Sequence, residues 1–297
     1  MTDRPVPPRP PRAPVDRARR DFVALSVATG LGAAARPSTA MLPVGEREVR
    51  IRTTDGTCDA VLLHPANGTH PGVVLWPDAA GLRPAMRDIG RRLAGEGYAV
   101  LVPNPFYRVG RAPMFESAAT IDFSDASTRA KLAPLIGSIT AAGAAERDAA
   151  AFVAFLDGQA QVDRARKLGV QGYCMGGALT FRTAAAVPER IGGAASFHGG
   201  GLVTDKPDSP HRLVPRMHAR VYVGVAANDD QRQPDAKEQL REAFAAAQVP
   251  AEVEVYPARH GWCVPDMPVE AGAPIYSAPD AERAWSKLLA LYGAALA

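Results

Sequence analysis

Cysteine is scarce in this sequence, and several other familiar signals are missing. Three cysteines in 297 residues, widely separated, are too few for a disulfide framework and form no C-x-x-C pair that would hold a metal. No apolar run approaches the roughly 18 residues of a membrane-spanning helix, and no repeat of fixed period is present. These absences argue against a disulfide scaffold, a metalloenzyme, a membrane-embedded protein and a solenoid, and we expect no metal, no cofactor and no stable membrane insertion.

The net charge is also low outside the first residues. The formal net charge is +3, and it owes much to arginines before residue 21, so the rest of the chain has no basic stripe for nucleic acid. With 47% apolar and 22% charged residues, the composition is typical of a globular protein with one large core. We therefore expect one catalytic domain, residues 41–297, a small-molecule substrate, no nucleic-acid partner, and a monomer or small homo-oligomer.

The first forty residues have the composition of an export signal. A Pro/Arg-rich stretch leads to Arg19-Arg20-Asp21-Phe22-Val23, which resembles a twin-arginine signature, and a mildly apolar run covers residues 22–35. This order predicts a signal segment over residues 1–40 and export to the periplasm or another extracytoplasmic compartment. A disordered tail on a cytoplasmic protein is the alternative.

The later sequence alternates strands with helices. A hairpin is predicted over residues 46–63, with its turn at residues 54–57. Strands at 72–76, 98–102, 166–170, 191–197, 220–225 and 251–256 then alternate with helices at 84–95, 144–156, 177–186, 234–247 and 278–290. Such β/α units predict an α/β fold with a mostly parallel central sheet and helices on both faces. The segment 108–143 is long for a connection and is predicted to be an irregular cap over the site.

The most informative string is Gly172-Tyr173-Cys174-Met175-Gly176-Gly177, which has the G-x-nucleophile-x-G form of a strand-to-helix elbow. The glycines remove side chains that would collide at so sharp a turn. Cysteine stands in the nucleophile's place, so the string predicts a thiol hydrolase. A buried cysteine that fills space before a glycine-rich helix is the structural alternative.

A cysteine nucleophile needs a base, because only a few per cent of a free thiol is ionised at neutral pH. His260 follows the last predicted strand, on the face where parallel-sheet enzymes bind ligands. Asp229 follows the preceding strand and is the preferred acid, with the adjacent Asp230 as the alternative. The resulting order of nucleophile, acid and histidine is that of the α/β-hydrolases.

These motifs resemble the dienelactone hydrolase family of the α/β-hydrolase superfamily over nearly all of residues 47–292. The resemblance rests on the cysteine elbow, on Leu75-Trp76-Pro77-Asp78-Ala79-Ala80-Gly81-Leu82, on the stretch 102–108 and on the stretch 256–261. It implies hydrolysis of a carboxylic ester or lactone through a thioester on Cys174. A catalytically silent small-molecule binding protein on the same fold is the alternative.

The resemblance also implies further site residues. The family's thiol-contacting glutamate falls on Asp78, a shorter carboxylate, and the oxyanion would be held by the backbone N–H groups of Met175 and Ala79. The family's arginine for a substrate carboxylate maps onto Arg108. A second such arginine has no match, and Trp262 suggests an apolar wall instead. A solvated loop cation is the alternative for Arg108, and a buried structural tryptophan is the alternative for Trp262.

One string in the sequence resembles an oxyanion-hole motif but stands in the wrong place for one. His198-Gly199-Gly200-Gly201 looks like the oxyanion motif of some lipases, but it follows the nucleophile instead of preceding it. We interpret it as a flexible loop after a strand that lines the pocket. Cys58 and Cys263 are expected to be packing residues or, alternatively, a bridged pair.

Overall fold

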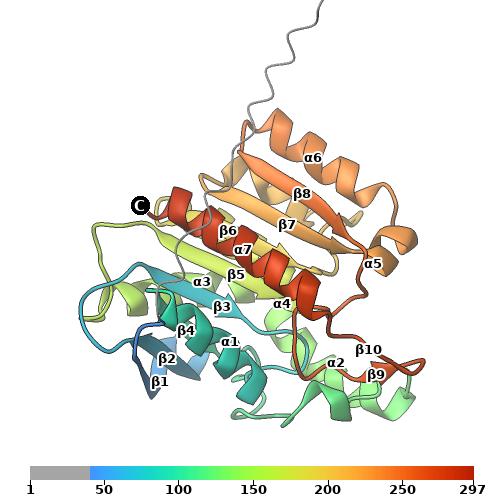
Figure 1. Cartoon of the computed structure of the whole chain (residues 1–297), viewed down its shortest axis with the longest axis horizontal. Helices are drawn as coiled ribbons and strands as arrows, with labels where there is room; N and C mark the ends of the chain where they lie inside the picture. Colours follow the sequence, from blue (N-terminus) through green and yellow to red (C-terminus); the bar gives the residue numbers. More distant parts are fainter. Residues whose placement is uncertain (1–40) are drawn as a thin grey trace, which may run out of the picture. The chain divides into compact units, whose positions relative to one another are not determined.

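The computed structural model describes residues 41–297, which fold around one eight-stranded sheet (Figure 1). The strand order is β1-β2-β4-β3-β5-β6-β7-β8. The strands are β1 (Val44–Thr53), β2 (Gly56–Pro65), β3 (Gly72–Trp76), β4 (Ala99–Pro103), β5 (Leu168–Tyr173), β6 (Ile191–Phe197), β7 (Arg220–Ala226) and β8 (Ala251–Tyr256). The strands β1 and β2 are antiparallel to their neighbours, and every other pairing in this sheet is parallel. The predicted mostly parallel sheet is therefore confirmed.

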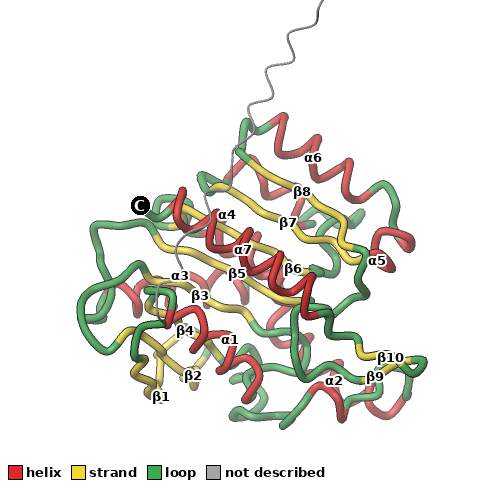
Figure 2. The backbone as a smooth tube through the Cα atoms, in the orientation of Figure 1, coloured by secondary structure: helices red, strands yellow, loops and turns green. Residues whose placement is uncertain are grey.

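Helices cover both faces of the sheet, as Figures 1 and 2 show. The helices are α1 (Pro84–Gly95), α2 (Ala126–Thr140), α3 (Ala144–Asp157), α4 (Met175–Ala186), α5 (Ala227–Arg232), α6 (Ala236–Ala246) and α7 (Ala278–Ala295), with the 3₁₀ segments η2 (Ala118–Thr120) and η3 (Pro210–Arg216). The buried faces of α1 and α7 form one apolar layer, and those of α3, α4 and α6 form the other. The central strands β3 and β4 are buried along their whole length because both of their faces are covered.

The first hairpin follows the predicted pattern. β1 pairs with β2 so that Thr53 lies opposite Gly56 across a two-residue turn, and Gly56 has a φ of 144°, which favours glycine. In β1 the two buried residues, Val49 and Ile51, alternate with exposed charged ones. This alternation shows that one face of the hairpin packs on the core and the other faces solvent.

The segment 108–143 is only partly the irregular cap that the sequence predicts. It contains η2 and the 15-residue helix α2, whose buried residues Leu132, Leu135 and Ile139 are spaced to fall on one helical face. Asp125 caps this helix by accepting a hydrogen bond from the Thr128 N–H at 2.7 Å. Pro134 within the helix obscures its pattern in the sequence, because proline usually ends a helix.

Two predictions concern the chain's relation to a membrane. Within residues 41–297, no helix combines the length and the apolar character that a membrane span needs. The predicted twin-arginine segment, residues 1–40, lies outside the described residues.

Candidate active site

The candidate site is a cavity of about 390 Å³ at the carboxyl ends of the parallel strands. Loops that follow five strands meet there: Asp78 follows β3, Cys174 follows β5, His198 follows β6, Asn228 follows β7 and His260 follows β8. This is the edge at which open parallel sheets bind ligands. The sheet therefore brings together residues that lie as far apart as positions 78 and 260 in the sequence.

Cys174 occupies the predicted elbow between β5 and α4. Its φ and ψ are 52° and −114°, a conformation that is strained for a residue with a side chain. A Cβ on Gly172 would lie 2.0 Å from the carbonyl oxygen of Gly176, and a Cβ on Gly176 would lie 2.5 Å from that of Trp76. Gly172 is thus needed for the strand-to-helix collision that the sequence pattern suggested, whereas Gly176 is needed because the helix starts against the end of β3.

His260 faces Asp229 and Cys174. The Nδ1 atom of its imidazole lies 2.6 Å from Oδ2 of Asp229. Burial alone would lower the pKa of His260, but the charge of Cys174 and hydrogen bonds to Asp229 and Cys174 raise it to about 10. These two partners therefore favour the protonated form of the imidazole.

The neighbouring aspartate has another partner. Asp230 receives a hydrogen bond from the Lys237 ammonium at 2.7 Å. Asp229, the residue preferred from the sequence, is the one that the short helix α5 turns toward the imidazole. The sequence did not show this helix, because it places the aspartates in a loop after the strand.

Asn228 is a site residue that sequence reasoning missed. Its side-chain oxygen accepts a hydrogen bond from the backbone N–H of His260 at 2.8 Å. The N–H of Ala227 bonds to the carbonyl of Ala258 at 2.9 Å. These two contacts tie the loop after β7 to the loop after β8, which holds the aspartate and the imidazole in one place. An asparagine beside the aspartate pair was the available signal.

Asp78 lines the cavity, but its carboxylate is bound by an arginine. Arg83 donates from Nη1 to Oδ1 of Asp78 at 2.7 Å and from Nη2 to Oδ2 at 3.0 Å. The same guanidinium donates to both oxygens of Asp266, at 2.8 and 2.7 Å. The contact between Asp78 and the thiol that the family resemblance implies is therefore absent from the described contacts, because this shorter side chain turns toward Arg83.

Arg83 was also missed in the sequence, although it carried a signal. It stands at the N-cap of α1, followed by Pro84, and a cation at a helix N-terminus opposes the helix dipole. Such a residue needs anionic partners, and Arg83 is fully buried between two of them. Asp266 in turn accepts a hydrogen bond from the Ala118 N–H at 3.0 Å, which attaches the cap segment to the cluster.

The two predicted oxyanion donors are backbone groups that flank the thiol. Ala79 lines the cavity with Cys174, in a turn in which the N–H of Ala80 bonds to the Asp78 carboxylate at 2.9 Å. Met175 is the first residue of α4, and the first N–H groups of a helix have no partner within the helix. Met175 is thus the chain neighbour of Cys174, and Ala79 lines the same cavity; neither amide depends on the identity of its side chain.

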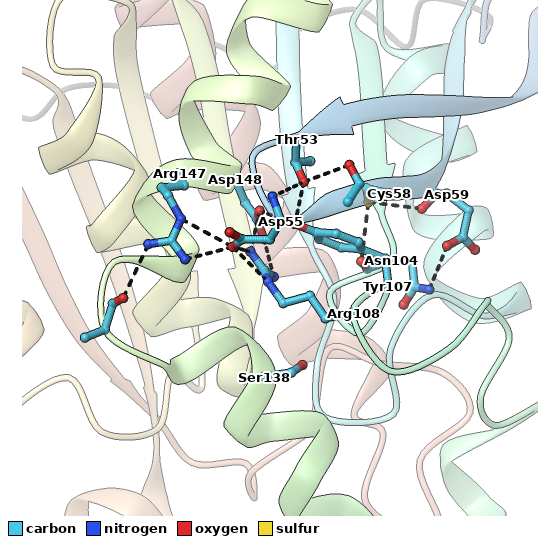
Figure 3. Close-up of polar contacts among 12 residues, drawn as sticks. Thr53, Asp55, Cys58, Asp59, Asn104, Tyr107, Arg108, Ser138, Arg147 and Asp148 are labelled. Carbon is cyan, nitrogen blue, oxygen red and sulfur yellow. Dashed lines mark hydrogen bonds and ion pairs between the residues drawn. The ribbon is translucent and has the colours of Figure 1, made fainter.

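Arg108, the predicted substrate-binding arginine, lies among carboxylates of the protein itself. Its guanidinium pairs with Asp148 at 2.7 and 2.8 Å and with Asp55 at 2.7 and 3.1 Å, and it lies 4.5 Å over the ring of Tyr107 (Figure 3). Among the described residues that line the cavity, Arg108 does not occur. It instead joins the turn of the first hairpin to α3, because Asp148 is buried and requires a cation.

Trp262 is not a wall of the cavity in the described structure either. Its side chain is fully buried, and it stacks on Tyr256 with ring centroids 4.7 Å apart. Through this stacking it supports the loop of His260, which connects the two residues. The apolar lining comes from other residues: Phe123, Met267 and Ile275.

The described part of the chain contains three free thiols, so Cys58 and Cys263 are not bridged. Burial raises the pKa of both thiols well above its usual range. Cys58 donates to the carbonyl of Asp59 at 3.3 Å, and Cys263 lines a separate cavity of about 180 Å³ with Phe197 and Trp285. Both are therefore packing residues.

Comparisons with known proteins agree with this architecture. The model of the dienelactone hydrolase family matches residues 58–296. A protein of Methylorubrum extorquens named "Putative carboxymethylenebutenolidase" is 30% identical over 284 residues, which cover 91% of this chain and 90% of that protein. A Rhodococcus opacus protein named "Carboxymethylenebutenolidase" is 28% identical and covers 68% of this chain and 75% of its own.

A solved structure shows the same fold. The crystal structure titled "Putative Dienelactone Hydrolase" from Klebsiella pneumoniae superposes with a TM-score of 0.70 at 25% identity, covering 84% of this chain and 99% of the other. The predicted α/β-hydrolase fold is thereby confirmed. Sequence, fold and cavity agree, and the chain belongs to the dienelactone hydrolase family.

Proposed function

We propose that this protein hydrolyses carboxylic ester or lactone bonds through a thioester on Cys174, with His260 as the acid–base group and Asp229 as its orienting partner. The observation that carries the proposal is the imidazole placed between Cys174 and Asp229 in the cavity. Membership of the dienelactone hydrolase family supports the same reaction class.

The first half-reaction forms the thioester. The sulfur of Cys174 attacks the carbonyl carbon, and the carbonyl electrons move to oxygen, where the N–H groups of Ala79 and Met175 stabilise the negative charge. Donors of this kind contribute about 3 to 4 kcal/mol to the transition state. The tetrahedral intermediate then expels the alkoxide, which takes the proton of His260 and leaves as an alcohol.

The second half-reaction releases the acid. His260 accepts a proton from water as that water attacks the thioester carbonyl. Collapse of this intermediate expels the sulfur of Cys174 and yields a carboxylic acid. Asp229 holds the Nδ1–H of the imidazole at 2.6 Å throughout, so the other nitrogen stays directed at the thiol.

Activation of the thiol is assigned to His260 and not to Asp78. A neighbouring imidazolium favours the thiolate, and both oxygens of Asp78 are occupied by Arg83. In this chain the carboxylate keeps the loop of Ala79 in shape. The binding-protein alternative depends on a thiol that Asp78 does not deprotonate or that export oxidises, and the assignment of the base to His260 is what sets our proposal apart from it.

The lining of the cavity suggests the acyl group. Phe123, Met267 and Ile275 provide apolar lining, and Arg232 and Arg259 are its basic residues. Arg259 is paired with Glu270. We propose acyl groups of small to medium size with an apolar portion, for which a volume of about 390 Å³ suffices.

The test is hydrolysis of a panel of chromogenic esters and of a dienelactone by the full chain under reducing conditions, with Cys174→Ala in parallel. We expect activity that this substitution abolishes. Wild-type activity that Cys174→Ala retains would overturn the nucleophile assignment, and absence of hydrolysis across the panel would count against the reaction class.

A thiol-directed alkylating agent gives an independent check. Cys174 should react faster than Cys58 and Cys263, because the pKa values of the latter two are raised by burial. His260→Ala should slow the reaction of Cys174. Equal and slow labelling of all three thiols would contradict an activated nucleophile.

We also propose export by the twin-arginine route. The support is the Arg19-Arg20 pair followed by the mildly apolar run of residues 22–35. Replacing both arginines with lysine should retain the protein in the cytoplasmic fraction. Unchanged fractionation of this variant would refute the proposal.

A further inference from the structure

His198 is a buried histidine beside the proposed triad that the reaction described above does not use. It follows β6, is 1% exposed and lines the catalytic cavity. The sequence suggested a flexible loop here. In the structure, however, the backbone N–H of His198 bonds to the carbonyl of Gly224 at 2.7 Å, which fixes the start of this loop against β7.

The imidazole of His198 contacts the nucleophile's backbone. Its Nδ1 lies 3.1 Å from the backbone nitrogen of Cys174. A backbone N–H can only donate, so Nδ1 must carry the lone pair and Nε2 must carry the proton. Burial, and after it the charge of His260, lowers the pKa of His198 well below its usual value, which keeps this ring neutral.

The other side of the same ring contacts the proposed base. The ring centroids of His198 and His260 are 4.8 Å apart at an interplanar angle of 60°, an edge-to-face contact. Trp262 lies on the ring as well, at 5.1 Å and 70°. Within residues 41–297, the buried Nε2 of His198 has no hydrogen-bond partner, and a buried polar group without a partner is destabilising.

The loop that carries His198 is fastened to the elbow on both sides. The N–H of Gly200 bonds to the carbonyl of Cys174 at 3.2 Å, and the N–H of Cys174 also approaches the carbonyl of Phe197 at 3.1 Å. A Cβ on Gly177 would lie 2.6 Å from Cα of Gly199. The elbow helix and this loop therefore touch backbone to backbone.

The backbone of His198 is itself strained. Its φ is 41°, in the left-handed region that residues with side chains seldom occupy. Glycine would adopt this φ at no cost, and three glycines follow in the sequence, yet position 198 itself carries a histidine. Strain that persists beside a proposed active site, together with an unpartnered buried nitrogen, indicates that the ring is kept for its place between Cys174 and His260.

We propose that His198 is a positioning residue that sets the nucleophile elbow and the ring of His260 in register, through its acceptor on the Cys174 amide and its edge contact with the His260 ring. This inference rests on the proposed function. It assigns no proton transfer to His198 and adds no contact with substrate.

Two substitutions separate the two contacts. His198→Asn keeps an acceptor near the Nδ1 position and suits a left-handed φ, but it removes the ring. His198→Phe keeps a ring and removes the acceptor. His211→Asn is the matched control, because His211 bonds to Ser209 at 2.8 Å and lies outside the catalytic cavity.

The measurements are kcat and KM for an ester substrate, the alkylation rate of Cys174 as a function of pH, and the melting temperature. Loss of register should lower kcat roughly 10- to 100-fold with KM within about threefold, since small misplacements cost this much. The alkylation of Cys174 should also become slower and its pH profile should change, because the imidazole of His260 is no longer held beside the thiol. His198→Asn should retain more activity than His198→Phe.

The outcomes distinguish this inference from the proposed function. If both His198 variants fold and keep kcat and the alkylation profile within twofold of the wild type and of His211→Asn, the positioning role is wrong. A lower melting temperature with unchanged kcat and profile would also overturn it, since that result indicates packing alone. If His260→Ala leaves the alkylation of Cys174 unchanged, the proposed function itself fails.

Discussion

Arg83→Met removes the cation that joins the oxyanion loop to the loop after the proposed base. The guanidinium is fully buried and makes paired hydrogen bonds with Asp78 and Asp266. Methionine fills similar volume but leaves both carboxylates without a cationic partner, with backbone N–H groups still bonded to them. Removing one member of a buried ion pair costs about 3–5 kcal/mol. We expect the free energy of unfolding to fall by an amount in this range. The Asp78 side chain is only 7% exposed and stays desolvated, whereas that of Asp266, at 20%, regains some solvation.

The size of this loss should depend on pH. Burial raises the pKa of Asp266, but hydrogen bonds and charge from Arg83 hold it below its usual range. A depressed carboxyl pKa stabilises the fold above the unfolded value of about 3.9, and this contribution is lost only as pH falls through the lower folded value. In the variant the contributions of Arg83 are lost, and burial, which raises the pKa, is opposed only by the hydrogen bonds from Ala118 and Ser117. The pKa therefore rises, and protonation relieves the unpaired charge as pH falls. The difference between wild type and variant should therefore be larger at pH 7 than at pH 5.

The assay is urea unfolding followed by tryptophan fluorescence at both pH values, with thermal unfolding as a second measure. The expected loss corresponds to a melting temperature lower by roughly 6–20 °C, at about 2–4 °C per kcal/mol for a domain of this size. Arg87→Met is the matched control on the same helix. Its guanidinium is 27% exposed and pairs with Glu46 and Glu48, so it should cost about 0–1 kcal/mol. Equal losses in the two variants, or a difference that does not shrink at pH 5, would refute the reasoning.

Two further predictions concern the elbow and the triad acid. Asp229→Asn should lower kcat about 10³- to 10⁴-fold because the imidazole loses its oriented partner, whereas Asp230→Asn should stay within a few-fold; similar losses in steady-state kinetics would undo the assignment. Gly177→Ala places a Cβ 2.4 Å from Oγ of Ser196 and should cost about 1–3 kcal/mol in urea unfolding. Gly200→Ala, where a Cβ meets nothing within 4 Å of the described atoms, should cost much less, and equal costs would contradict the close approach.

The order of elements could be predicted because each depends on local pattern. The strand of residues 72–76, the helix of residues 84–95 and the strand of residues 191–197 end where the sequence placed them. The elbow was equally accessible, since it is written as one short string, although only Gly172 is required by a near neighbour in the chain and Gly176 is required by the end of β3. His260 and Asp229 could be placed at one sheet edge because parallel strands end together.

What could not be predicted depends on partners distant in sequence. Arg108 was assigned to substrate, but Asp55 and Asp148, 53 and 40 residues away, bind it. Asp78 was assigned to the thiol, but Arg83 turns it aside, with Asp266 contributed from 183 residues further along. No periodicity or motif predicts which buried carboxylate pairs with a given arginine, because the packing of loops determines the pairing.

Trapping of the acyl-enzyme tests the central claim most directly. The full chain is mixed with p-nitrophenyl acetate, quenched in acid within the first turnovers, digested and analysed by mass spectrometry, with Cys174→Ala as the control. The account predicts an acetyl group on the peptide that carries Cys174, absent from the variant and removed when wild-type turnover is allowed to finish. Steady hydrolysis by the wild type with no acetyl group on Cys174, or with the group on another side chain, would contradict it.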